Sequence, residues 1–156
     1  NVCKLEEVIE LCKNKVGVNV EIKEEGYEEK IVDLLVSNFS YVDILITSFK
    51  SKVIRKIKLK DSKLTTGFLI GESFSYITFY RVIKESFTMR EFLYSKADFV
   101  SPYYKIYEIG LMHKFKKLKV PIQLWTVNNL SLLKDLINRD IHSIVTDVSS
   151  KLLQEL

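Results

Sequence analysis

The segment Tyr41-Val-Asp-Ile-Leu-Ile-Thr-Ser-Phe49 decides the fold class of this chain. Its apolar run is nearly continuous, which is typical of a strand that is buried on both faces of a parallel sheet. Apolar residues recur at helical spacing before it, over 27–39, and a helix over 52–59 follows it, with Ser51 as a candidate cap. A buried strand between two helices indicates an alternating β/α protein with a parallel sheet.

The same alternation runs along the whole chain. The predicted strands cover 16–23, 41–49, 64–71, 97–102, 120–127 and 141–147. The predicted helices cover 5–12, 27–39, 52–59, 73–96 with a break near Thr88, 107–118, 130–138 and 150–156. A (β/α)₈ barrel needs eight strands in typically about 250 residues. We therefore expect a TIM (β/α)₈-type barrel with about six of its eight β/α units. Residues 1–156 would be its C-terminal three-quarters and one domain, with two strands upstream.

Composition is that of an ordinary globular domain. The 156 residues are 47% hydrophobic and 28% charged, with only 5 Gly and 2 Pro. No apolar stretch reaches the roughly 18 residues that a membrane span needs. The two cysteines, Cys3 and Cys12, form no CxxC pair, so we expect neither a disulfide framework nor a zinc site. Sparse cysteine fits a reducing compartment, and we expect a cytoplasmic protein.

The positive charge is mild, and its densest run is Lys52-Val-Ile-Arg-Lys-Ile-Lys-Leu-Lys60. Such a run can contact phosphate or an anionic surface, or it can be the solvated face of a helix. The helix face is favoured because no aromatic residues are interleaved with it and no nucleic-acid motif accompanies it. We expect no nucleic-acid partner.

Chemistry in parallel β/α folds gathers at the carboxyl ends of strands. The first strand carries Glu21 and Lys23 there, on one face. A carboxylate in this place could bind a hard cation such as Mg²⁺ or Ca²⁺, and the lysine could meet an anionic oxygen. An ion pair that merely closes the end of the barrel is the alternative.

Other polar and aromatic residues at the strand ends have two interpretations each. Ser48 could bond phosphate or backbone, Trp125 could line a substrate pocket or belong to the core, and Asp147 could be a ligand or, the favoured choice, a helix cap. His113 lies within a predicted helix and His142 near the start of the last strand. Neither histidine is placed for acid or base chemistry.

Several of these segments together resemble the glycerophosphodiester phosphodiesterases. Val18-Asn-Val-Glu-Ile-Lys23 resembles the family's "NIEIK" strand, and Gln123-Leu-Trp-Thr-Val-Asn128 is similar to its "VWTVN". The further matches are Lys4-Leu-Glu-Glu-Val8 to "PTLEEV", Ile44-Leu-Ile-Thr-Ser-Phe49 to "VIISSF", Thr66-Gly-Phe-Leu69 to "TGLL", Ala97-Asp-Phe-Val-Ser-Pro102 to "ADAVSP" and Ser143-Ile-Val-Thr-Asp147 to "GIITD". They run in the family's order over essentially the whole chain.

The resemblance implies a metal-dependent hydrolase that splits a small glycerophosphodiester into glycerol 3-phosphate and an alcohol. It places the role of a divalent-metal ligand on Glu21, with Mg²⁺ or Ca²⁺ as the cofactor, and the role of phosphate contact on Lys23. Trp125 would line the glycerol side of the pocket. Ser48 is a further candidate for substrate binding.

The chain departs from the family where the proton-transfer groups belong. The family's "HRG", "E-x-D" and "HD" motifs are absent, and Val148 replaces the usual Pro after Thr146-Asp147. We therefore expect no catalytic residue in this chain, activity in the complete protein, and an inactive chain in isolation. Two alternatives stay open, namely a non-catalytic barrel relative that binds or scaffolds and a different phosphate-binding barrel enzyme. A homo-oligomer is also left open.

Overall fold

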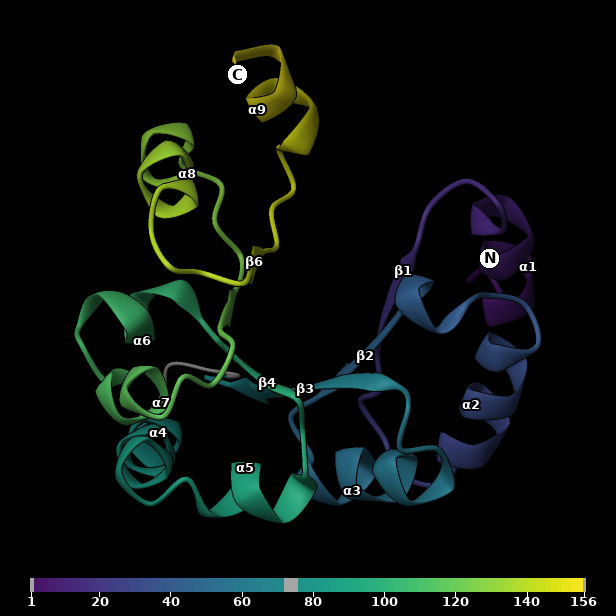
Figure 1. The fold of residues 1–156 in the computed structure, drawn as a ribbon, viewed down its shortest axis with the longest axis horizontal. Coiled ribbons are helices and arrows are strands. Elements are labelled where there is room, and N and C mark those ends of the chain that lie inside the picture. The colour runs from purple at the N-terminus through teal and green to yellow at the C-terminus, as the bar shows by residue number, and fades with distance from the viewer. Residues whose placement is uncertain (1, 72–75, 156) are drawn as a thin grey trace. The chain divides into compact units, whose positions relative to one another are not determined.

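Strands and helices alternate along the chain in the computed structural model, which describes residues 2–71 and 76–155 (Figure 1). The strands are β1 (Val18–Glu21), β2 (Ile44–Ser48), β3 (Thr65–Ile70), β4 (Phe99–Pro102), β5 (Gln123–Leu124) and β6 (Ser143–Ile144). The helices are α1 (Leu5–Cys12), α2 (Glu28–Val36), the 3₁₀ turn η1 (Tyr41–Asp43), α3 (Ser51–Lys60), α4 (Tyr76–Thr88), α5 (Arg90–Ser95), α6 (Tyr104–Glu108), α7 (His113–Lys117), α8 (Leu130–Ile137) and α9 (Ser149–Glu155).

The strands are parallel neighbours in chain order. Hydrogen bonds join β1, β2, β3 and β4 into one sheet in that order, and β5 pairs with β6. Val18 lies opposite Ile44, and Leu45 lies opposite Thr65. Single parallel bridges, such as that from Val100 to Ile122, connect β4 with β5. Each strand is followed by at least one helix, as expected of a parallel sheet whose crossovers are helical.

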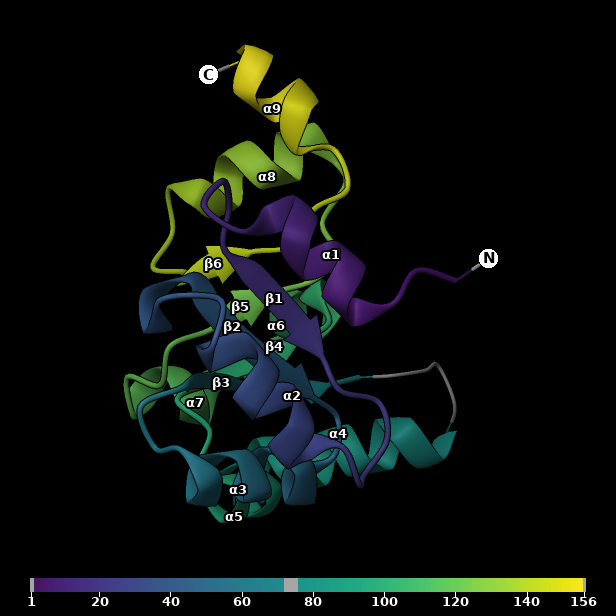
Figure 2. The same ribbon diagram turned by 90° about the vertical axis from the view of Figure 1, so that its right-hand side faces the viewer.

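The chain divides into two units, residues 1–68 with 91–98 and residues 69–90 with 99–156. In the first unit, α1, α2 and α3 lie on one side of β1 and β2 (Figure 1), and Figure 2 views the same helices from outside. Their contact is a cluster of buried aliphatic side chains, among them Ile9, Val32, Leu35, Ile46, Ile54 and Ile57. Burial of such side chains is the main stabilising contribution to this layer.

The second unit has its own buried side chains. Val100, Met112, Phe115 and Leu124 are fully buried, and Phe99 nearly so. Helix α4 packs against α7, and Lys114 of α7 donates a hydrogen bond to the carbonyl of Phe87 at 2.7 Å. Figure 1 shows the two helices next to each other. Phe115 is the residue of α7 that faces inward.

Several local predictions were wrong, and the strands expected over 120–127 and 141–147 are only β5 and β6, of two residues each. The helix expected over 107–118 is two short helices, α6 and α7, and Gly110 lies between them at φ 79°. The strand expected from Tyr41 begins at Ile44, because 41–43 form η1. Ser51 is the first residue of α3 rather than its cap, and its hydroxyl donates to Glu91. By contrast, the break expected near Thr88 is confirmed, since α4 ends there and Met89 adopts φ 54°.

The basic run over 52–60 is largely neutralised by acidic neighbours. Lys56 Nζ lies 3.1 Å from Glu28 Oε1, and Lys60 Nζ lies 3.0 Å from Asp33 Oδ1. Lys58 Nζ lies 3.0 Å from Asp98 Oδ1. The solvated, ion-paired helix face is therefore the better interpretation of this run. In the described ranges, no helix is both long and apolar enough to cross a membrane.

Candidate active site

The Glu21–Lys23 pair lies at the carboxyl end of β1. Glu21 is opposite Thr47 in the parallel register, so the pair adjoins the end of β2. Lys23 Nζ lies 3.9 Å from Glu21 Oε1, and the side chains are 77% and 37% exposed, respectively. Ile22 between them is buried with the helices, which places both charges on the other face of the strand. This open, loosely paired geometry leaves both groups accessible to a ligand, whereas a tight buried ion pair would not.

Ser48 holds the ends of β1 and β2 together. Its buried hydroxyl donates to the carbonyl of Ile22 at 2.6 Å and accepts from the amide of Lys50 at 3.1 Å. The amide of Ile22 in turn donates to the carbonyl of Thr47 at 2.8 Å. These bonds extend the pairing of the two strands beyond Glu21. Ser48 therefore fixes the backbone that carries the charged pair, and phosphate contact by its hydroxyl stays a prediction.

Trp125 follows the end of β5 and is half-buried in the second unit. Its indole Nε1 donates to the carbonyl of Ser101 at 2.8 Å, and its own carbonyl accepts from the amide of Tyr104 at 2.8 Å. The ring of Tyr103 lies 5.5 Å from the indole and 4.8 Å from the ring of Tyr104. The indole is thus held in one orientation by a bond to the neighbouring strand.

Tyr103 and Tyr104 are candidate site residues that the sequence patterns did not single out. Burial raises the pKa of the Tyr103 hydroxyl, and its hydrogen bond with Tyr104 and the nearby charge of Glu108 raise it further. Both tyrosines directly follow Pro102 at a strand end. Two adjacent tyrosines at the end of a predicted strand were the signal that the sequence offered, and they form the start of α6.

Asp147 lies after β6 and links its end to that of β5. Its Oδ2 accepts from Asn128 Nδ2 at 2.9 Å, and its amide donates to Asn128 Oδ1 at 2.9 Å. Thr146 Oγ1 lies 3.3 Å from the same amide oxygen and accepts from the amide of Val148 at 3.2 Å. Asn128 and Asp147 therefore have a role in joining two strand ends.

A divalent cation needs more ligands than Glu21 alone. Ca²⁺ takes six to eight oxygen ligands, and Mg²⁺ needs an octahedral set. Within residues 2–71 and 76–155, no group of three His, Cys, Asp or Glu side chains is placed to hold a metal ion. One carboxylate next to a lysine fits one ligand position of such a site. The described residues do not form the whole site.

The two histidines lie away from the strand carboxyl ends within their unit. His113 is the first residue of α7. His142 precedes β6, where its amide donates to the carbonyl of Ile122 and its ring lies 6.1 Å from that of Phe99. The start of a strand is the rim of a β/α barrel that carries stability rather than catalysis.

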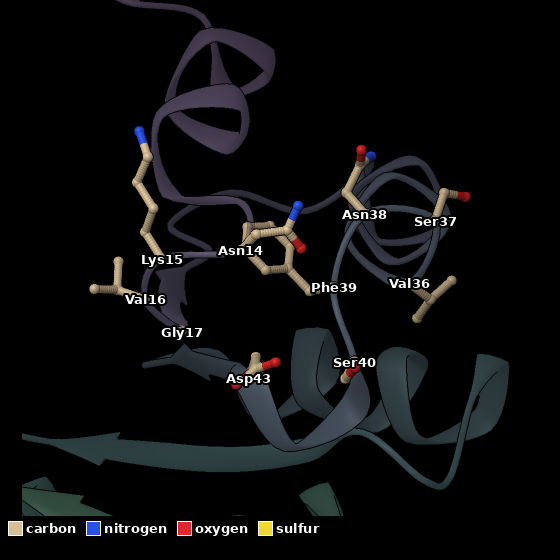
Figure 3. Close-up of a pocket in the computed structure, with 10 residues that line it drawn as sticks. All are labelled: Asn14, Lys15, Val16, Gly17, Val36, Ser37, Asn38, Phe39, Ser40 and Asp43. Carbon is tan, nitrogen blue, oxygen red and sulfur yellow. The ribbon is translucent and has the colours of Figure 1, made fainter.

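A cavity of about 590 Å³ lies at the amino-terminal side of β1 and β2 (Figure 3). It is lined by the α1–β1 turn, residues 14–17, by residues 36–40 at the end of α2 and directly after it, and by Asp43. In Figure 3 the side chains of Lys15 and Asn38 extend in parallel from separate segments, and Ser37 points away from both. Since they do not converge and the cavity is at the rim opposite Glu21, it is not the candidate active site.

Comparison with known protein families shows to which family the chain belongs. The model of the glycerophosphoryl diester phosphodiesterase family matches residues 1–151. The chain belongs to the glycerophosphoryl diester phosphodiesterase family. This phosphodiesterase-family chain is also 30% identical over 139 residues to an uncharacterised protein of Mycoplasma genitalium. The match covers 83% of the chain and 52% of that relative, so the chain spans about half the relative's length.

Solved structures give the same fold for this family member. The glycerophosphodiester phosphodiesterase from Parabacteroides distasonis has a TM-score of 0.64 at 16% identity, covering 97% of this chain and 60% of that one. An Oleispira antarctica phosphodiesterase, in complex with the product sn-glycerol-3-phosphate, has a TM-score of 0.63 at 17% identity, with 88% and 54% covered. The enzyme from Agrobacterium tumefaciens gives 0.65 at 14% identity, with 94% and 58% covered. The predicted TIM-barrel class is therefore confirmed, and the six β/α units are part of such a barrel.

Proposed function

We propose that the complete protein is a metal-dependent hydrolase that splits a glycerophosphodiester into glycerol 3-phosphate and an alcohol. The observation that carries the proposal is the accessible Glu21–Lys23 pair at the carboxyl end of β1, in a chain of this family. The Oleispira antarctica relative binds sn-glycerol-3-phosphate, which is the product expected here. In this hydrolysis, water forms a new P–O bond, the bond to the alcohol breaks, and the alcohol leaves with a proton.

Each residue of this chain has a separate task in the proposal. The Lys23 ammonium stabilises the negative charge that develops on the phosphoryl oxygens. Glu21 contributes one carboxylate to a divalent cation, Mg²⁺ or Ca²⁺, whose chemistry is to polarise the phosphodiester when it is bound. Trp125 forms an apolar wall for the glycerol carbons. Proton transfer belongs to groups other than His113 and His142.

Activity of the full-length protein on glycerophosphocholine tests the proposal. Chelation should abolish turnover, and Glu21→Gln should lower affinity for the divalent cation. Lys23→Met should lower kcat roughly 100-fold, because it removes a charge that acts on the transition state. The matched control is Glu24→Gln, which removes a carboxylate from an exposed pair with Lys50 at 2.6 Å near the same strand end. Chelator-insensitive turnover, or equal loss in Glu21→Gln and Glu24→Gln, would refute the assignment of Glu21.

A non-catalytic barrel relative is the second candidate, supported by the positions of the two histidines. It predicts that the full-length protein binds glycerol 3-phosphate through Lys23 without turning over any diester. Calorimetric titration of the wild type and of Lys23→Met, alongside the turnover assay, separates the two candidates. The 156-residue chain alone is expected to be inactive under both.

A further inference from the structure

Helix α4 presents an aromatic stripe to solvent. Tyr76 is 98% exposed, Tyr80 66% and Phe87 70%. Positions separated by four and seven residues lie on one side of an α-helix, so these three rings form a single row along it. Phe79, which is 53% exposed, flanks the row. We call Tyr76, Phe79, Tyr80 and Phe87 the aromatic stripe of α4.

The side of α4 that faces its own unit is partly polar. Val82 is buried there together with Glu85 and Ser86, and the Ser86 hydroxyl donates to the carbonyl of Val82 at 2.7 Å. A helix that only covers a core places its apolar stripe inward and its charges outward. In α4 the aromatic side chains of the stripe point outward, and polar side chains are among those that face inward. Leaving several aromatic rings in water forgoes the stabilisation that their burial would give, which marks the face as a contact surface.

Further barrel strands would not cover this stripe. α4 follows β3, and β3 lies between β2 and β4 in the hydrogen-bonded order. Another β/α unit can join a parallel sheet only at an edge strand, and β3 is an interior strand. The outer face of α4 is therefore not a place where a barrel of this type adds a unit.

The exposed charged side chains of α4 are both positive. Arg81 and Lys84 are exposed on α4, whereas its acidic residue, Glu85, is buried. Lys114 of α7 is exposed and lies against the Phe87 carbonyl, at the far end of the stripe. A second copy of this chain, docked by the same surface about a twofold axis, would bring these cations together at a cost in electrostatic energy. An anionic partner surface fits better.

We propose that α4 docks this protein on an anionic lipid surface. The aromatic stripe would lie at the level of the headgroups, where amphipathic tyrosine rings are favoured, and Arg81, Lys84 and Lys114 would face the lipid phosphates. This is peripheral binding by a surface helix and does not depend on the proposed hydrolysis. It gives the exposed rings of α4 an apolar environment and its cations a counter-charge.

Co-sedimentation of the full chain with vesicles tests this proposal. Vesicles of equimolar phosphatidylglycerol and phosphatidylcholine should bind the chain, vesicles of phosphatidylcholine alone should not, and added salt should weaken binding. Arg81→Gln with Lys84→Gln should lower the partition coefficient roughly 30-fold. Tyr80→Ser with Phe87→Ser should lower it at least about tenfold. The matched control, Tyr27→Ser, removes a 53% exposed ring at the start of α2 and should not change the partition coefficient.

A second measurement keeps the test independent of variant folding. Phe87→Trp should show a fluorescence blue shift with the mixed vesicles and no shift with phosphatidylcholine alone. Equal partition of wild type and both double variants, each with wild-type circular dichroism, would overturn the proposal. So would a dimer in sedimentation velocity that Tyr80→Ser dissociates, because the stripe would then bind a second copy.

Discussion

Asp98 is the residue whose replacement tests the hydrogen-bond network of the first unit most directly. Its carboxylate accepts two bonds from Lys58 Nζ at 3.0 Å and bonds from the Thr66 amide and hydroxyl at 2.8 and 3.1 Å. Lys58 Nζ also donates to the carbonyls of Ser62 and Leu64. One ion pair therefore ties α3, the start of β3 and the segment before β4 together.

The burial of Lys58 sets the size of the effect. Its side chain is only 13% exposed, whereas that of Asp98 is 43% exposed. Leaving a buried charge unpaired costs about 3–5 kcal/mol. The exposed side of Asp98 lets water reach the site, so we expect Asp98→Asn to lower the free energy of unfolding by about 2–3 kcal/mol. For a chain of this size, that corresponds to a fall in Tm of roughly 5–10 °C.

Urea denaturation followed by circular dichroism measures this change, and Asp135→Asn is the matched control. Asp135 pairs with Arg139 four residues on, and both side chains are about half exposed. Such an exposed helical pair contributes only about 0.3–0.5 kcal/mol. A double-mutant cycle with Lys58→Met then isolates the pair from the other bonds of Asp98. Equal destabilisation by Asp98→Asn and Asp135→Asn would refute the argument from burial.

Two further predictions concern pH and backbone conformation. Burial raises the pKa of Glu28, but bonds from its own amide, Lys56 and Gly26 outweigh it and hold the pKa below its usual 4.5. The stability from ionised Glu28 is thus present above pH 4.5 and lost as pH falls through the lowered pKa. When the pH is lowered from 7 to 3, the urea midpoint should therefore decrease more in the wild type than in Glu28→Gln. Gly71→Ala should destabilise more than Gly26→Ala in thermal melts. Both glycines have positive φ, but only at Gly71 would an added Cβ collide with Ile106 Cδ1. Ile106→Val should therefore recover part of the loss.

The order of strands and helices followed from the sequence because hydrophobic periodicity is a local property. Ile44 and Ile46 are buried inside the first unit, and the helices on both sides formed where apolar residues recur at helical spacing. The break after Thr88 was also visible in the sequence. Hydrophobic periodicity gave a wrong prediction where a run with helical spacing contains a residue that ends a helix. The helix predicted through Gly110 divides, because that residue adopts a positive φ that ends a helix.

The candidate site likewise has a part that the sequence predicted and a part that depends on the tertiary structure. Glu21 and Lys23 could be placed on one face of a strand from their alternation alone, because successive side chains of a strand point to opposite faces. Only the tertiary structure brought Ser48 to the carbonyl of Ile22 and the Trp125 indole to the carbonyl of Ser101. Those bonds join residues 26 and 24 positions apart, and their formation depends on which strands become neighbours.

The sequence by itself determined that this chain alternates strands and helices and where its charged strand end lies, because both depend on spacing within a few residues. The tertiary structure alone decided which lysines of the 52–60 run find acidic partners and that α4 turns its aromatic rings outward. Helical periodicity identifies an apolar stripe but not which side meets the core. That choice depends on what the neighbouring helices and strands leave to be covered.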